Sequence, residues 1–202
     1  MKLSDRTHWD ARYTQNPESW TEPDDFLVSA YDEFLAKLTP GRALDLAGGA
    51  GRNAVFLAQR GWQVKLVDIS EVGLGLAREK ASSIDRDAQA PSHAKINSLL
   101  TTEIVDLHAT TDLGTSQYDL ITVFYFLRRE LFPALVRALK PGGWLIYRTY
   151  TIDRLNVPGG PRDPKFLLQP KELLNVFASL KILRYRETQE GKAAAELVGQ
   201  KP

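Results

Sequence analysis

The chain has 202 residues, with 26 Lys or Arg, 25 Asp or Glu, a formal net charge of +1 and no Cys. One domain typically takes ~100–200 residues, and a near-neutral charge excludes a global field that would recruit nucleic acid or an anionic membrane. The lack of Cys excludes disulfides, thiolate metal sites and a cysteine nucleophile.

The first half of the chain alternates between helical and extended patterns. Polar and aromatic residues open it, among them Trp9, Tyr13 and Trp20. Apolar residues then recur at helical spacing up to Leu38, where Pro40-Gly41 end the pattern. We predict a helix over 25–38, a strand at 43–46, a buried helix over 53–60 closed by Gly61, a strand at 64–67, a helix over about 71–82 and, after a polar stretch, a strand near 104–105.

The second half contains an apolar run, Leu120–Phe126, whose lack of polar alternation predicts a central strand covered on both faces. The other predicted elements are a helix over 131–139, a strand at 144–147, a loop over 151–164, a helix over 170–180, and strands at 181–187 and 193–200 that meet across Glu190-Gly191. Strands that alternate with helices predict an α/β fold: a Rossmann-like, doubly wound, mostly parallel sheet with an antiparallel hairpin at its C-terminal edge.

A glycine-rich loop follows the first predicted strand, where ligands of such sheets bind. Gly48, Gly49 and Gly51 have no Cβ, so the backbone can turn sharply and approach a ligand closely. The helix that begins near Arg52 would present its unpaired N–H groups to that ligand. Alternatively, the loop is only a tight connection between a strand and a helix.

Acidic residues mark the ends of three predicted strands. Asp68 lies 19 residues after Gly49, where a carboxylate can accept the hydroxyl protons of a ribose. It can instead cap the following helix, although Ser70 fits that role at least as well. Asp45 and Asp106 stand at the same rim, so the three carboxylates together indicate a ligand with a ribose, an amino group and a cationic centre.

Two cofactors fit this loop. Gly49–Ala54 matches the G-x-G-x-x-A fingerprint of dinucleotide-binding proteins, which favours an NAD(P)-dependent oxidoreductase. Against it, Asp45 would repel a pyrophosphate, and little chain follows the sheet for a separate substrate domain. S-adenosylmethionine has no phosphate but carries an ammonium and a sulfonium, which suit the acids better.

These motifs resemble those of class I S-adenosylmethionine-dependent methyltransferases, and among them the tellurite-resistance-type small-molecule methyltransferases. The resemblance runs from Trp9 to Lys201. Its motifs are Asp45–Gly51, Arg52-Asn53, Val67–Ser70, Asp106-Leu107, Tyr118–Ile121 and Leu139–Gly143. The resemblance implies a seven-stranded sheet whose last strand is antiparallel, and S-adenosyl-L-methionine as the cofactor.

The resemblance also implies which residues hold the cofactor, with Asp68 on the ribose and Asp106 on the adenine amino group. The expected cofactor-binding residues are Asp45, Ala47, Gly48, Gly49, Gly51, Arg52, Asn53, Asp68, Ile69, Asp106, Leu107 and Phe124. We expect one domain over 1–202, made of an N-terminal lid or helix (1–40), a cofactor-binding core (41–150) and a segment with a substrate loop, helix and hairpin (151–202).

Two residues depart from the family pattern. Ala47 replaces a glycine at the start of the loop, and alanine suits most turn geometries but not a positive φ. Arg128 stands where similar sequences would have a histidine, so a base at that position is missing here.

Methyl transfer from a sulfonium is an in-line displacement, which positioning of the two reactants can catalyse without a general base. No catalytic residue is therefore assigned. Trp9, Arg12 and Tyr13 either close over the cofactor as a lid or pack on the sheet in a peripheral helix. Phe124, Tyr125 and Phe126 either face the sulfonium or belong to the core.

The acceptor is expected near the loop 151–164 and the turn 127–129, with Trp9, Tyr13, Tyr125 and Arg129 as candidate lid or substrate residues. Five arginines of this region either create a field that attracts an anionic or soft nucleophile or simply form a solvated surface. They are Arg128, Arg129, Arg148, Arg154 and Arg162. His108 is expected to face solvent.

We expect a cytoplasmic enzyme, because no apolar run approaches the ~18–20 residues of a membrane span and Met1–Asp10 lack the apolar core of a signal peptide. The three histidines, His8, His93 and His108, are too scattered for a metal cluster. A small molecule is the expected partner, without nucleic acid or membrane, for a monomer or homodimer. Besides a methyltransferase and an oxidoreductase, a catalytically silent module that binds an adenosyl ligand stays open.

Overall fold

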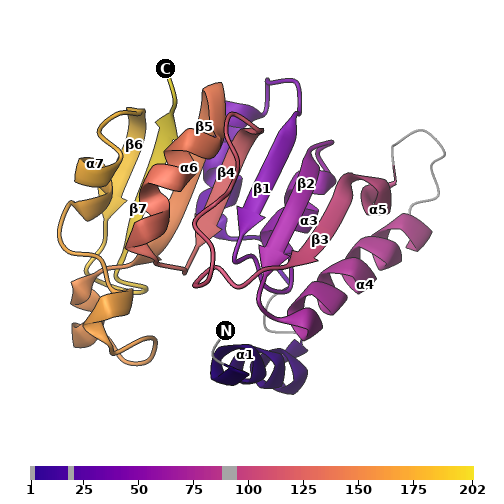
Figure 1. The fold of residues 1–202 in the computed structure, drawn as a ribbon, viewed down its shortest axis with the longest axis horizontal. Helices are drawn as coiled ribbons and strands as arrows, with labels where there is room; N and C mark the ends of the chain where they lie inside the picture. Colours follow the sequence, from indigo (N-terminus) through magenta and orange to yellow (C-terminus); the bar gives the residue numbers. More distant parts are fainter. Residues whose placement is uncertain (1–2, 18–20, 88–94) are drawn as a thin grey trace. The chain divides into compact units, whose positions relative to one another are not determined.

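A computed structural model describes residues 3–17, 21–87 and 95–202 of the chain. Trp20 and His93 lie outside these residues. The chain divides into two compact units, Met1–Thr110 and Thr111–Pro202, so the boundary falls within the segment 41–150. Figure 1 shows the helices and strands of both units.

The sheet of the first unit consists of three parallel strands in the order β3-β2-β1 (Figure 1). They are β1 (Arg42–Leu46), β2 (Gln63–Asp68) and β3 (Leu100–Ile104). In the register of β1 and β2, Asp45 faces Leu66, and β2 in turn aligns Asp68 with Ile104. Because all three strands run the same way, their carboxyl ends share one edge, as the sequence predicted for the acids.

Helices precede the first of these strands and connect the others. They are α1 (Leu3–Gln15), α2 (Asp25–Ala30) with a π-helical continuation η2 (Tyr31–Leu35), α3 (Arg52–Ala58), α4 (Glu71–Asp87) and α5 (Ile96–Leu99). The Asp24 carboxylate accepts the N–H of Phe26 and thereby caps α2. The predicted helix 25–38 is an α-helix that continues as a π-helix and ends at Leu35. Helix α4 runs five residues beyond its predicted end at 82.

The second unit contributes four strands in the order β4-β5-β7-β6. They are β4 (Tyr118–Phe124), β5 (Leu139–Tyr150), β6 (Lys181–Glu187) and β7 (Ala194–Gln200). β4 and β5 are parallel, whereas β7 is antiparallel to both β5 and β6. With the strands of the first unit the sheet has seven strands, so the predicted mostly parallel α/β sheet with an antiparallel C-terminal hairpin is confirmed.

Shorter helical pieces connect the strands of the second unit. They are η3 (Arg129–Leu131), α6 (Phe132–Ala138), η4 (Ile152–Asn156), η5 (Pro164–Phe166) and α7 (Glu172–Val176). The prediction of a helix over 170–180 is too long, because α7 covers only its middle. Among the residues that the structure describes, no helix is both long and apolar enough to cross a membrane.

An ion-paired ladder crosses the three C-terminal strands of the second unit. Glu196 on β7 lies opposite Arg148 on β5 and Arg186 on β6 in the two registers. Its carboxylate is 3.2 Å from the Arg148 guanidinium and 2.8 Å from that of Arg186. Glu196 is only 1% exposed, so this pairing fixes the alignment of the three strands at a buried position.

Candidate functional site

The glycine-rich loop of the first unit follows β1 and turns in the left-handed region of backbone space. Ala47, Gly49 and Gly51 have φ values of 54°, 56° and 71°. The expectation that alanine at position 47 would avoid a positive φ is therefore wrong. A non-glycine residue in this region costs roughly 1–2 kcal/mol, which the surrounding hydrogen bonds offset; the N–H of Gly48 donates to Val67 and that of Gly51 to Gly48.

Two glycines of the loop are required by close contacts. A Cβ on Gly48 would lie 2.3 Å from Oδ2 of Asp45, a residue that is fully buried under the loop. A Cβ on Gly49 would lie 1.9 Å from the hydroxyl oxygen of Tyr13. The loop therefore has a carboxylate against Gly48 and an aromatic side chain of α1 against Gly49.

Asp68, at the end of β2, joins the loop to the start of α4. Its Oδ2 accepts the N–H of Gly49 and its Oδ1 that of Ser70, both at 2.9 Å. Burial raises the pKa of this carboxyl, while the N–H groups of Ser70, Gly49 and Ile69 act in the opposite direction. Ser70 itself caps α4, because its hydroxyl accepts the N–H of Gly73 at 3.0 Å, as the sequence suggested.

Asp106 lies just beyond β3, at the same edge as Asp45 and Asp68. Its Oδ1 accepts the N–H of His108. His108 is exposed, as expected. The N–H of Val105 donates to the carbonyl of Asp68 at 2.9 Å and fastens this segment to β2. Three carboxylates thus stand at the ends of three adjacent strands.

Four more predicted cofactor-binding residues lie in this unit: Ile69 and Leu107 beside the acids, and Arg52 and Asn53 at the start of α3. Leu107 is buried and Ile69 is half-buried. The Arg52 guanidinium pairs with the Asp24 carboxylate at 3.2 Å, and Asn53 accepts the Asp24 N–H at 2.9 Å. These two side chains therefore hold α2 against α3, a structural role that sequence reasoning did not identify.

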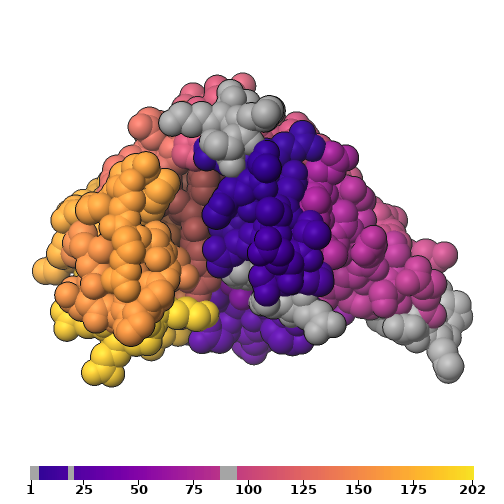
Figure 2. Space-filling view, turned by 90° about the horizontal axis from the view of Figure 1, so that it is seen from below, coloured from indigo at the N-terminus to yellow at the C-terminus, as the bar shows by residue number. Residues whose placement is uncertain are grey.

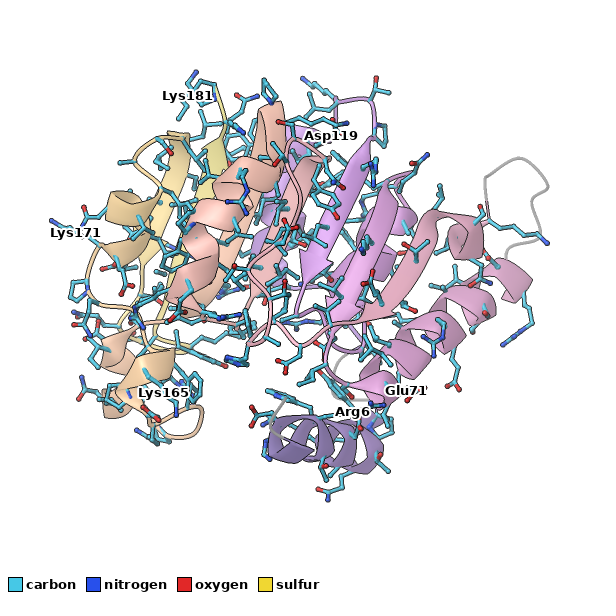
Figure 3. The ribbon with its side chains drawn as sticks, viewed as in Figure 1. Arg6, Glu71, Asp119, Lys165, Lys171 and Lys181 are labelled. Atoms are coloured by element: carbon cyan, nitrogen blue, oxygen red, sulfur yellow. The ribbon has the colours of Figure 1, made fainter. Side chains whose placement is uncertain are left out.

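Helix α1 packs over the glycine-rich loop and the start of α4. Its Asp10 carboxylate accepts the Ser70 hydroxyl at 2.6 Å and the Val72 N–H at 3.3 Å. Its Arg6 pairs with Glu71 at 2.6 Å, and the two side chains meet between the helices in Figure 3. Figure 2 shows the indigo surface of α1 beside the magenta surface of α4. The segment is therefore a helix that packs on the loop and on the start of α4; whether it acts as a lid over a cofactor stays a prediction.

Tyr13 is the residue by which α1 reaches the loop. It is 7% exposed, and its ring stacks on Trp9 with a centroid distance of 6.0 Å. The Arg12 guanidinium lies 5.3 Å from the Trp9 ring centroid. Burial, and secondly the charge of Asp68, raise the pKa of the Tyr13 phenol above its ordinary value of 10.0.

Tyr13 is expected to keep its proton while the protein is folded. Because its folded-state pKa is raised, the unfolded chain releases this proton first, and stability falls as the pH rises above about 10. In a titration followed at 295 nm, the native wild type and Tyr13→Phe should show the same absorbance change up to pH ~11. In concentrated urea the variant should titrate one tyrosine fewer. A one-tyrosine difference in the native proteins near pH 10 would show that the phenol is accessible to water.

The second unit contains the remaining candidates. Phe124 ends β4 and is buried, whereas Tyr125 and Phe126 are half-buried. The predicted strand 120–126 ends two residues early, because Tyr125 adopts a φ of 57° that a strand cannot continue.

The five arginines considered for the acceptor region mostly cross-link the chain, a role that neither sequence alternative described. Arg129 pairs with Glu172 at 2.6 Å and donates to the carbonyls of Lys165 and Leu167. Its burial is partial, and the hydrogen bond to Glu172 raises its pKa. The other partners are Glu130 for Arg128, Glu196 for Arg148, the carbonyls of Pro158 and Gly191 for Arg154, and the carbonyls of Leu155 and Val157 for Arg162. Apart from the Arg128–Glu130 pair, sequence reasoning could not find these contacts, since the partners are distant residues or backbone groups.

Comparisons with known proteins find relatives of this chain. The family described as "Methyltransferase domain" matches residues 20–181. The chain is 30% identical over 160 residues to a ubiquinone biosynthesis O-methyltransferase of Burkholderia multivorans, covering 74% of this chain and 61% of that protein. It is 28% identical over 158 residues to the probable S-adenosyl-L-methionine-dependent methyltransferase TehB of Haemophilus influenzae, covering 74% and 49%. The chain thus spans about half to three fifths of the length of these relatives.

Among solved structures, the fold is similar to magnesium protoporphyrin IX methyltransferase of Synechocystis with bound SAH. The TM-score is 0.71, the identity 17%, and the alignment covers 100% of this chain and 99% of the other. At that identity the likeness concerns the fold alone.

Proposed function

The chain belongs to the methyltransferase-domain family, of the class I type that uses S-adenosyl-L-methionine, and from this premise we propose that it transfers the methyl group of this cofactor to a small-molecule acceptor. The observation that carries the proposal is the buried Asp68 carboxylate, which ends β2 and binds the N–H of Gly49 in the loop. A carboxylate beside a close backbone turn supports the proposal, because it can accept the hydroxyl protons of a ribose.

The residues present fit this cofactor better than a dinucleotide. Asp45 is fully buried and in contact with Gly48, so a pyrophosphate on this loop would approach a carboxylate. An ammonium or a sulfonium would be stabilised there instead. Asp68 would hold the ribose, Asp106 the adenine amino group, and the backbone of Gly48–Gly51 the amino-acid end. The cofactor supplies an activated methyl group, so the chain need only bind and orient the reactants.

Within this proposal α1 is the cover of the cofactor site. Tyr13 contacts Gly49, and Asp10 fixes the helix to Ser70. A cover of this kind excludes water and holds the cofactor in place. No general base is assigned, since in-line displacement can proceed by orientation alone.

Replacing Asp68 by alanine tests the ribose assignment. We expect the affinity for S-adenosylhomocysteine, measured by calorimetry, to fall by roughly 1.5–3 kcal/mol, the scale of hydrogen bonds to a charged group. Asp68→Asn keeps one side-chain oxygen that can accept the Gly49 N–H, so it should lose less folding stability than Asp68→Ala does. Asp32→Ala removes an exposed carboxylate of the same unit and should leave the affinity unchanged. An Asp68→Ala protein that folds and binds as tightly as the wild type would refute the assignment.

A further inference from the structure

Helix α1 is fastened to the start of α4 by polar contacts (Figure 1). Oδ1 of Asp10 accepts the hydroxyl of Ser70 at 2.6 Å and the N–H of Val72 at 3.3 Å. Its Oδ2 lies 3.5 Å from the guanidinium of Arg6, one turn earlier on α1, and Arg6 pairs with Glu71 at 2.6 Å. Asp10 therefore joins α1 to the first turn of α4.

A carboxylate suits the position of Asp10. Helix α4 has 17 residues, and a negative charge is stabilised at the end where its first N–H groups point outward. Ser70 caps this end by accepting the N–H of Gly73, and Asp10 accepts that of Val72. The Asp10 side chain is 27% exposed and that of Glu71 61%, so water screens the contacts of Asp10 less than the ion pair of Glu71.

Ser70 connects these contacts to Asp68, the carboxylate proposed for the ribose. The N–H of Ser70 donates to Oδ1 of Asp68, while its hydroxyl donates to Asp10. Burial raises the pKa of Asp68, and the nearby charge of Asp10 acts in the same direction. A single residue therefore links the helix that packs on the loop to the acid at the end of β2.

The Tyr13 ring shows how closely α1 lies against the loop. A Cβ on Gly49 would lie 1.9 Å from the Tyr13 hydroxyl oxygen, and a Cβ on Gly73 would lie 3.0 Å from two of its ring carbons. The ring thus occupies the space that two glycines leave open, one in the loop and one in the first turn of α4. Because the residue is only 7% exposed, a ligand can reach the face of Gly49 beneath the ring only after α1 moves away.

We propose that the contacts of Asp10 with Ser70 and Val72 form a latch that gates the cofactor, so that α1 must be released before the cofactor enters or leaves. This proposal rests on the proposed function. Asp10 is a positioning residue in it, which acts through Ser70 and α1. Every contact of the latch joins residues of the chain itself, so the latch holds α1 with or without a ligand. Breaking it therefore speeds entry and release together and changes the affinity little.

The test measures the association and release rates of S-adenosylhomocysteine on the full chain by surface plasmon resonance. Asp10→Ala removes both hydrogen bonds of the latch, so we expect both rates to rise roughly tenfold, the scale of hydrogen bonds to a charged group, and the dissociation constant to change by less than about threefold. Asp10→Asn keeps an oxygen that can accept the Ser70 hydroxyl, and its rates should fall between those of Asp10→Ala and the wild type. Without any ligand, the amides of α1 should exchange hydrogen faster in Asp10→Ala than in the wild type.

Glu71→Ala is the matched control. It removes a carboxylate from the same contact between α1 and α4, but a mostly exposed one that pairs with Arg6, so both rates and the hydrogen exchange of α1 should stay close to those of the wild type. Rates or hydrogen exchange in Asp10→Ala that match those of Glu71→Ala would overturn the proposal. Faster release without faster association would also overturn it, since Asp10 would then contribute to affinity and not to gating. Failure of the wild type to bind S-adenosylhomocysteine would instead contradict the proposed function, and the gate with it.

Discussion

Replacement of Gly49 by valine is expected to abolish binding of S-adenosylhomocysteine while the fold is retained. Position 49 has a φ of 56°, and the first side-chain atom would lie 1.9 Å from the Tyr13 hydroxyl oxygen. A β-branched residue is strained in this conformation whatever the space. Since Tyr13 belongs to the N-terminal helix α1, displacement of that helix can relieve the clash without disrupting the sheet. Calorimetry should show no heat of binding, and far-UV circular dichroism should stay close to that of the wild type.

Gly75→Val provides the control for this prediction. Gly75 lies on α4, has no positive φ, and a Cβ there would meet only the Arg78 guanidinium at 3.9 Å. This variant should fold and bind normally. If Gly49→Val binds as tightly as Gly75→Val does, the loop is only a connection between β1 and α3.

Replacement of Glu196 by glutamine is expected to cause the largest loss of stability in the second unit. Its carboxylate pairs with the Arg148 guanidinium, whose side chain is 7% exposed, so the substitution removes a negative charge from beside a buried cation. Breaking a buried ion pair in this way costs about 3–5 kcal/mol. Urea denaturation followed by circular dichroism should show a corresponding drop in the free energy of unfolding.

Arg186→Gln removes only the exposed partner of Glu196, so it shows how much the buried Arg148–Glu196 pair contributes by comparison. The Arg186 side chain is 58% exposed, and exposed ion pairs contribute only about 0–1 kcal/mol. We therefore expect a small change in this variant. Equal losses in Glu196→Gln and Arg186→Gln would mean that the buried Arg148 pairing does not stabilise the strands more than a surface contact does.

Much of the fold was predictable because its signals are local. Apolar runs bounded by glycine or acidic residues located β1, β2 and the two strands of the C-terminal hairpin within one or two residues. They did not locate the start of β3. The same runs located the acids, since a residue that ends a parallel strand must stand at the common edge of the sheet. Asp45, Asp68 and Asp106 were found in this way.

Features that depend on distant contacts were not predictable. The positive φ of Ala47 is imposed by the enclosed loop, and the early end of β4 results from the conformation of Tyr125. The partners of Arg129 lie 36 or more residues away along the chain, and two of them are backbone carbonyls that no side-chain pattern records. Glu196 lies opposite Arg148 and Arg186 because of the strand register, and this register is fixed only when the strands pair.

The central claim is that the first unit holds S-adenosyl-L-methionine rather than a dinucleotide. Calorimetric titration of the purified chain with S-adenosylhomocysteine, and separately with NADH, tests it most directly. We predict saturable binding of S-adenosylhomocysteine and none of NADH, because the carboxylates under and beside the loop oppose a pyrophosphate. Binding of NADH alone would contradict the cofactor assignment and return the oxidoreductase alternative.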